Sequence, residues 1–199
     1  HSGAGKGFHF IPEIGEEVLV GFESGNAEKP FVMGTHYNGS ETSSYHTSGN
    51  DKKVIHTRSG TKIILNDAEG SVFIEDPSGN TYLMDGAGNI NVNAPNDMTF
   101  TAGKNMNINV GENMTTNVGM NKSNSAGMNI TEVAGMNIFQ NATMDYSLNA
   151  TNITKIASET YSYEANDIHK NAMENIDIVA GKDYTQNSEE TIHNLSGEK

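Results

Sequence analysis

The chain has 199 residues, a formal net charge of −13, no Cys and no Trp. The acidic balance argues against a nucleic-acid groove or an anionic membrane surface, because both need clustered Lys and Arg, and the lack of Cys excludes disulfides and thiolate sites. No apolar stretch approaches the roughly 18 residues that span a bilayer, and the chain begins at His1 rather than Met, so we expect no stable membrane insertion and a segment of a longer protein.

Residues 8–39 contain short β-type runs separated by turn formers. "FHFIP" is followed by "EEVLVGFE", in which Val18, Val20 and Phe22 alternate as in a half-buried strand. "SGNAEKP" then predicts a hairpin loop before "FVMGTHYNG". We therefore expect residues 1–39 to be part of a small β-barrel.

Residues 40–53 are Ser, Thr, Gly and charged residues with few apolar side chains, so they are predicted to be a connector. Residues 54–86 then read "VIHTRSG", "TKIILNDAEG", "SVFIEDPSGN" and "TYLMDGAGN". Each apolar run ends in a turn that contains Gly or Asp. We expect four short strands here, in a β segment that we call the neck.

From residue 87 the sequence repeats every eight residues, as in AGNINVNA, PNDMTFTA, GKNMNINV and GENMTTNV. Asn or Asp occupies the third position of nearly every octad, and one residue drops out near Asn152 and another near Asp167. About fourteen octads continue to about Ser196, and a fixed period of this kind indicates a repeat architecture. Residues 87–199 are therefore predicted to form one repetitive segment.

Side chains alternate between the two faces of an extended strand, so an even period keeps one face apolar in every octad. That single narrow face cannot enclose a core within one chain. Three chains wound together would bring their apolar faces to a common axis and leave no open strand edges. We predict a three-chain β-helix needle with these core residues: Ile90, Val92, Met98, Phe100, Met106, Ile108, Val110, Met114, Ile130, Ile138, Tyr146, Leu148, Ile176 and Ile178.

In the middle of the needle, the face predicted to point to the axis contains polar and charged residues instead of apolar ones. In each octad this face is formed by the even positions, counted from the first residue of the octad. In the middle of the needle these positions include Lys122, Asn124, Glu132 and Gln140. Three copies of a charged side chain around a narrow axis are costly unless water or an ion offsets the charge. We predict a hydrated or ion-containing axial section over residues 116–140. A local register slip that turns these side chains outward is the alternative.

The segment "GFHFIPEIGEEVLVGFESGNAEKPFVMGTHYNG" closely resembles the end of the OB-fold barrel in the VgrG family of type VI secretion tip proteins. That family shows an F-I-P-x-I-G-x-E-V-L-V-x-F run, a hairpin with Pro, and G-x-x-Y-N-G. "HTRSGTKIILNDAEG" and the octads also look like the family's neck and needle, and phage tail-spike hub proteins are similar. The family's N-terminal hub half is missing, and Phe8 stands where the family usually has Trp. The matching residues are Phe10 to Pro12, Ile14 to Val20, Phe22, Pro30 and Gly34 to Gly39.

The resemblance implies an all-β homotrimer: the end of an OB-fold barrel, a β neck and an intertwined three-chain needle. It would be the non-enzymatic, cofactor-free puncturing spike of a contractile secretion system. A PAAR-type tip protein would cap its C-terminal end, beyond about Ile192, while the tail tube and effectors would join through the N-terminal part. Such a spike is assembled in the bacterial cytoplasm and then delivered out of the cell. A phage tail spike or receptor-binding fibre is the alternative, followed by a glycan-cleaving tailspike.

Residues that could carry chemistry do not form a recognisable motif. His36, His46 and His56 lie in or beside the connector without the spacing of a helical metal site, and His169 and His193 occupy odd, outward positions of the octads. A glycosidase would use paired carboxylates, and the candidates lie at strand ends and turns, where Asp is also an ordinary turn former. No catalytic, cofactor or metal residue is predicted among these carboxylates: Asp67, Glu69, Glu75, Asp76 and Asp85.

Overall fold

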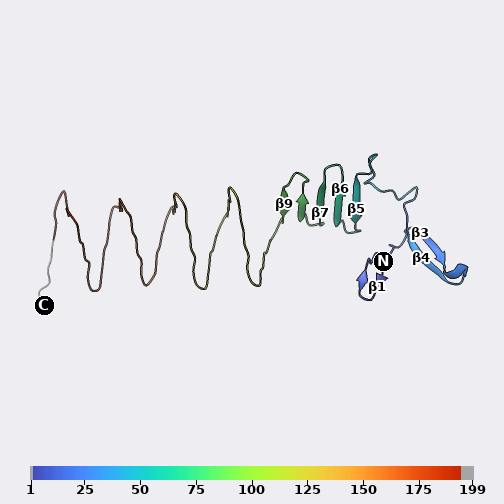
Figure 1. Cartoon of the computed structure of the whole chain (residues 1–199), viewed down its shortest axis with the longest axis horizontal. Helices are drawn as coiled ribbons and strands as arrows, with labels where there is room; N and C mark the ends of the chain where they lie inside the picture. The colour runs from blue at the N-terminus through green and yellow to red at the C-terminus, as the bar shows by residue number, and fades with distance from the viewer. Residues whose placement is uncertain (1, 194–199) are drawn as a thin grey trace. The chain divides into compact units, whose positions relative to one another are not determined.

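The computed structural model describes residues 2–193, with side chains from Ala4 onward. The chain divides into two compact units, His1–Asn117 and Val118–Lys199. Regular structure in the described residues is β apart from one short 3-10 turn, so the predicted all-β class is confirmed (Figure 1). The predicted tip surface falls mainly on residues 194–199, outside the described residues. The elements are β1 (Ser2–Gly3), β2 (Lys6–Gly7), β3 (Val18–Phe22), η1 (Glu23–Gly25), β4 (Pro30–Thr35), β5 (Lys52–His56), β6 (Lys62–Asn66), β7 (Ser71–Glu75), β8 (Thr81–Met84) and β9 (Ile90–Asn93).

The N-terminal residues form two small antiparallel pairs, β1 with β2 and β3 with β4. The β3–β4 hairpin confirms the strand and turn predicted from the alternation at Val18, Val20 and Phe22, and η1 closes it. The ladder shifts by a residue between Leu19 and Val20, which is a β-bulge. "FHFIP" is not part of a strand in the described chain.

Strands β5 to β9 form a five-stranded antiparallel meander in which each strand pairs with the next in sequence. The four strands predicted over residues 54–86 are confirmed as β5 to β8. Two differences from the sequence interpretation appear. β5 begins at Lys52, inside the range predicted as connector, and the first octad contributes β9 as a fifth strand (Figure 1).

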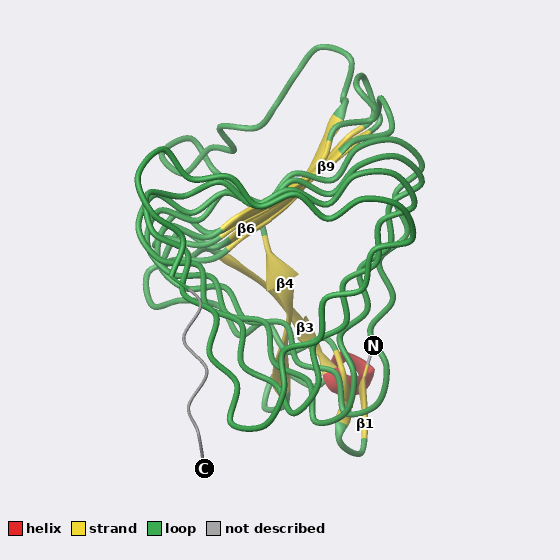
Figure 2. Ribbon diagram, turned by 90° about the vertical axis from the view of Figure 1, so that its left-hand side faces the viewer, coloured by secondary structure: helices red, strands yellow, loops and turns green. Residues whose placement is uncertain are grey.

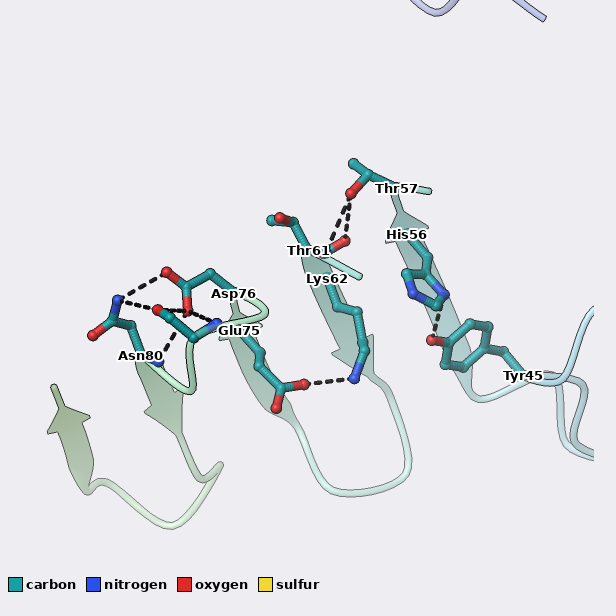
Figure 3. Close-up of polar contacts among 9 residues, drawn as sticks. Tyr45, His56, Thr57, Thr61, Lys62, Glu75, Asp76 and Asn80 are labelled. Atoms are coloured by element: carbon teal, nitrogen blue, oxygen red, sulfur yellow. Dashed lines mark hydrogen bonds and ion pairs between the residues drawn. The ribbon is translucent and has the colours of Figure 1, made fainter. Parts of the chain in front are cut away.

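Two tight turns of this sheet are held by an aspartate at the end of a strand. Asp76 Oδ1 accepts from the backbone N–H groups of Ser78 and Asn80, both at 3.0 Å, while Asn80 Nδ2 donates to Asp76 Oδ2 at 2.8 Å (Figure 3). Asp85 makes the same pattern with Ala87 and Asn89. The carboxylate thus replaces part of a backbone turn and returns the chain along the sheet.

Beyond β9 the described chain contains no further strand, and Figure 2 colours it as loop. Its bends nevertheless recur regularly. Successive bends begin eight residues apart, except for steps of seven from 151 to 158 and from 166 to 173. These two steps coincide with the places where one residue drops out of the sequence repeat. The bends lie at 95–96, 103–104, 111–112, 119–120, 127–128, 135–136, 143–144, 151, 158–159, 166, 173–174, 181–182 and 189–190.

Candidate functional site: an uncovered apolar face

One face of the β5–β9 sheet is apolar except for one lysine on its edge strand β5. Cross-strand pairing sets Ile63 opposite Ile74 and Leu65 opposite Val72, so these side chains lie on the same side of the sheet. The neighbouring strands extend the row of Ile63 and Ile74 with apolar residues on both sides. The row of Leu65 and Val72 is extended by apolar residues of β8 and β9, whereas on β5 it ends in Lys53. We call this surface the apolar face; its residues are Ile55, Ile63, Leu65, Val72, Ile74, Tyr82, Met84, Ile90 and Val92.

The opposite face of the sheet is mixed. A central row of Val54, Ile64, Phe73 and Leu83 is flanked by polar side chains. Among these, Lys62 Nζ donates to Glu75 Oε2 at 2.6 Å (Figure 3), and this hydrogen bond raises the pKa of Lys62. When the two sides of an antiparallel sheet differ in this way, the more apolar side is usually the one that is covered.

The apolar face continues into the repeat through Ile90 and Val92, which belong both to β9 and to the first octad. We number each later unit from its first bend residue, so that position 4 of the unit 103–110 is Met106 and position 6 is Ile108. Met128, a corner residue at position 2, is 91% exposed, and Phe139, which is at an odd position, is 89% exposed. Apolar residues at positions 4 and 6 are less exposed, as Ile108 at 59% shows. Exposure therefore separates the apolar residues at positions 4 and 6 from those at the corner position 2 and at odd positions.

All predicted core residues lie on exposed surface in the single chain, with exposed fractions between 46% for Met98 and 71% for Phe100. They do not contact a common core, since none of the described side chains is buried. The assignment of these positions to an interface between chains stays a prediction. The residues concerned are Ile90, Val92, Met98, Phe100, Met106, Ile108, Val110, Met114, Ile130, Ile138, Tyr146, Leu148, Ile176 and Ile178.

The residues of the predicted hydrated section are also exposed: Lys122, Asn124, Glu132 and Gln140. Gln140 can be placed further, because Tyr146 Oη donates to Gln140 Oε1 at 2.6 Å. This contact joins position 6 of one unit to position 4 of the next, so the two side chains share a face. Lys122 and Glu132 make no ion pair with any described residue, and their place on an axis stays a prediction.

The backbone of the repeat is as uncovered as its apolar side chains. Within the described chain, residues 94–193 form no backbone-to-backbone hydrogen bond. Extended backbone that is to be buried needs partners for its N–H and C=O groups. This segment therefore has both an apolar face and a hydrogen-bonding edge available to other strands.

The accessible surface of the whole chain is also much larger than that of a self-contained domain. The chain exposes 19917 Å². A folded monomer of 21.4 kDa is expected to expose about 9,000 Å² from the usual scaling of surface with mass. The chain thus has about twice the surface of a self-contained domain, which is typical of a protein that completes its core with other chains.

The carboxylates considered as catalytic candidates each have a local partner. Asp67 pairs with Lys53, Glu75 with Lys62, and Glu69 accepts from Ser71 Oγ. Asp76 and Asp85 hold their own turns. Hydrogen bonds from Ser78 and then Asn80 lower the pKa of Asp76 to about 2, and those from Asn89 lower the pKa of Asp85.

Two of the histidines considered as metal ligands have partners of another kind. His36 Nε2 is 3.1 Å from Glu17 Oε1, and His56 Nδ1 is 3.0 Å from Tyr45 Oη (Figure 3). Within residues 2–193 no three His, Asp or Glu side chains gather as a metal site would require. No helix in the same range is long and apolar enough to cross a membrane.

Comparison with known proteins identifies the N-terminal segment. Residues 1–37 match the family model of the type VI secretion system/phage-baseplate injector OB domain. No curated protein matches the chain. The matched range contains the β3–β4 hairpin and ends before the sheet and the repeat. Over residues 1–37 the chain is therefore similar to the OB domain of the injectors of type VI secretion systems and phage baseplates.

Proposed function

We propose that three copies of this chain form the spike of a contractile injection system of the type VI secretion kind. In this proposal residues 1–39 complete an OB-fold barrel, the β5–β9 sheets form a neck, and residues 87–199 wind into an intertwined three-chain β-helix. The spike acts mechanically, as a rigid point that punctures a target envelope. It has no catalytic role.

The observation that carries the proposal is the uncovered repeat: over residues 94–193 it has an apolar face without a core and a backbone without backbone-to-backbone hydrogen bonds. The whole chain exposes on the order of 10,000 Å² more than a self-contained monomer of its mass, which is far above the roughly 800 Å² per partner of an ordinary interface. Burial on that scale is typical of chains that fold only together.

Further copies of the same chain are the partners that suit this surface best. The eight-residue period places apolar residues at the same positions of successive units, so identical chains related by rotation would present matching faces at each level. Three chains would also supply strands on both sides of every strand, which removes open edges. About fourteen units spaced about 4.8 Å apart would make a needle of roughly 65 to 70 Å.

The matched injector domain supports the biological setting of the proposal. A spike of this kind would carry a PAAR-type cone at its C-terminal end and would join the tail tube and effectors through its N-terminal part. It would be assembled in the bacterial cytoplasm and delivered out of the cell. The description of the matched domain names phage baseplates as well, so a phage tail spike with the same needle is the alternative.

The mass of the purified chain in solution tests the proposal. Light scattering combined with size-exclusion chromatography should give three times the mass of one chain, and small-angle scattering should give an elongated particle. A monomer at micromolar concentration would contradict the proposal. Turnover of peptidoglycan or polysaccharide, lost on substitution of a carboxylate pair, would contradict the non-enzymatic role.

A further inference from the structure

Four side chains from three successive units of the repeat form a cluster that contains two lysines and two tyrosines. Lys155 Nζ lies 5.7 Å from the centre of the Tyr161 ring, and Lys170 Nζ lies 5.1 Å from the centre of the Tyr163 ring. The two rings stand edge to face with centroids 4.6 Å apart. These distances are those of cation–π and aromatic pair contacts, so the four side chains form one group.

The spacing of the bends places this cluster on the apolar face. The units 151–157 and 166–172 are seven residues long, and each has one bend residue where longer units have two. The missing residue is therefore at the corner, in position 2. When position 2 is left empty in these two units, Lys155 and Lys170 occupy position 6, like Tyr163. Without the empty position, Lys155 would be at position 5, which is odd.

Exposure of the neighbouring isoleucines supports the correction. Ile153 and Ile168, two residues before the lysines, are 53% and 52% exposed, as position 4 residues are elsewhere in the repeat. Ile156, next to Lys155, is 90% exposed like the outward residues. Because side chains alternate along an extended chain, Lys155 shares the face of Ile153.

The charge of the two lysines is not balanced on this face. Neither lysine forms an ion pair with a described residue. Positions 4, 6 and 8 contain no Asp or Glu from residue 143 to residue 180. The nearest carboxylates at an even position of a unit are Glu159 and Glu174. Both are at position 2, the corner position at which Met128 is 91% exposed. Identical partner chains would add the same residue types and hence no compensating acid.

We propose that this cluster binds a multivalent oxyanion, phosphate or sulfate, on the axis of the assembled needle. The inference rests on the three-chain needle proposed above. Each chain would contribute two ammonium groups and two phenols to a section closed on both sides by apolar units, which contain Leu148 and Ile176. Like charges enclosed in this way need a counter-charge, and an oxyanion accepts hydrogen bonds from both groups.

The local contacts keep the lysine in its charged form. A side-chain hydrogen bond to Tyr161 raises the pKa of Lys155. The tyrosine rings pack against the lysine ammonium groups. The Tyr163 hydroxyl donates to the Tyr161 oxygen, which raises the pKa of Tyr163, so the Tyr161 hydroxyl is the one left to donate to an anion. Lys122, the lysine predicted to lie on the axis from the sequence alone, has no comparable aromatic partner among the described residues.

Ion chromatography of the acid-denatured protein tests the proposal. Wild-type protein purified in phosphate- and sulfate-free buffer should release at least one oxyanion per three chains. The K155Q/K170Q variant should release at least about tenfold less, since it loses the charge-assisted hydrogen bonds. The matched control K104Q/K182Q removes the same charge from corner positions and should release the wild-type amount.

Light scattering on the same samples separates this inference from the proposed function. A wild-type protein that is not a trimer overturns both. A wild-type trimer that releases no oxyanion, or a K155Q/K170Q trimer that releases as much as wild type, overturns the oxyanion site alone. If K155Q/K170Q does not assemble, Y161F/Y163F provides a second variant that keeps the rings and the charges; release unchanged from wild type would then contradict the site.

Discussion

The β5–β9 sheet and the repeat that follows it use similar alternating sequences with different results. In the sheet, each strand returns along its predecessor because a turn with Asp76, Asp85 or a Gly reverses the chain. In the repeat, each corner only bends the chain, and residues 94–193 form no backbone-to-backbone hydrogen bond with one another. Turn chemistry therefore decides whether an alternating segment can pair within its own chain or must pair with others.

The largest expected effect comes from a charge placed on the apolar face of the repeat. Ile108→Asp would set a carboxylate at position 6 in each of three chains, and burying each unpaired charge costs several kcal/mol. We expect loss of the trimer in light scattering. The control Asn109→Asp adds the same charge at the neighbouring odd position and should stay trimeric. Equal stability of the two variants would show that positions 6 and 7 do not differ in burial.

Hydrogen exchange compares the two regions directly. If partner chains pair the repeat, its amides in the assembled protein should be protected roughly a thousandfold or more, as for a folded domain with about 5 kcal/mol of stability. Mass spectrometry of peptides from residues 94–193 and from β6 and β7 would measure this. Rapid exchange confined to the repeat would mean that its backbone remains unpaired in the assembly.

Replacing a glycine by alanine should change the free energy of unfolding more in the sheet than in the repeat. Gly86 has φ +77°, and an added Cβ would overlap the backbone carbonyl oxygen of Glu69. Gly86→Ala should therefore cost about 1–3 kcal/mol of unfolding free energy. Gly111→Ala meets no atom within 4 Å in its own chain and should change the free energy by less than about 0.5 kcal/mol. Denaturant unfolding would measure both, and a cost at Gly111 equal to that at Gly86 would indicate close approach of a partner backbone.

The smallest expected effect is on the pH dependence of thermal unfolding at acidic pH. The pKa of Asp76 is lowered from 3.8 to about 2 by hydrogen bonds from Ser78 and Asn80. Because the folded-state pKa is the lower one, the carboxylate stabilises the fold above about pH 4, and this contribution is lost as the pH falls towards 2. Thermal unfolding between pH 5 and pH 2 should therefore depend less on pH in Asp76→Asn than in wild type. Asp97→Asn, at a carboxylate without a hydrogen bond in the described chain, should retain the wild-type dependence.

Much of the sheet could be predicted from sequence because its turns are marked locally. Gly and Asp at the ends of short apolar runs located β5 to β8. The fifth strand was missed because Ile90 and Val92 alternate in the same way whether they pair with β8 or begin the repeat. "FHFIP" has the alternation of a strand, yet it belongs to no sheet in the described chain.

The candidate interface was only partly accessible from sequence. An even period indicates which residues share a face, but it does not specify how many chains meet there. The cluster around Tyr161 and Tyr163 was missed, although the dropped residues near Asn152 and Asp167 had been recognised. The sequence does contain a signal for the cluster. Because the missing residue of each short unit is at the corner, Lys155 and Lys170 fall at even positions. The side-chain contacts show this placement.

The two shortened corners, at residues 151 and 166, indicate where the repeat accepts changes in length. A deletion inside an extended segment would turn every later side chain to the opposite face, because alternation has a period of two. A deletion at the corner leaves the alternation of the later units intact, since the chain there is already changing direction. Insertions and deletions between related repeats should therefore accumulate at corners or as whole units, and the corners are the places at which peptide tags can be inserted without inverting the remainder of the repeat.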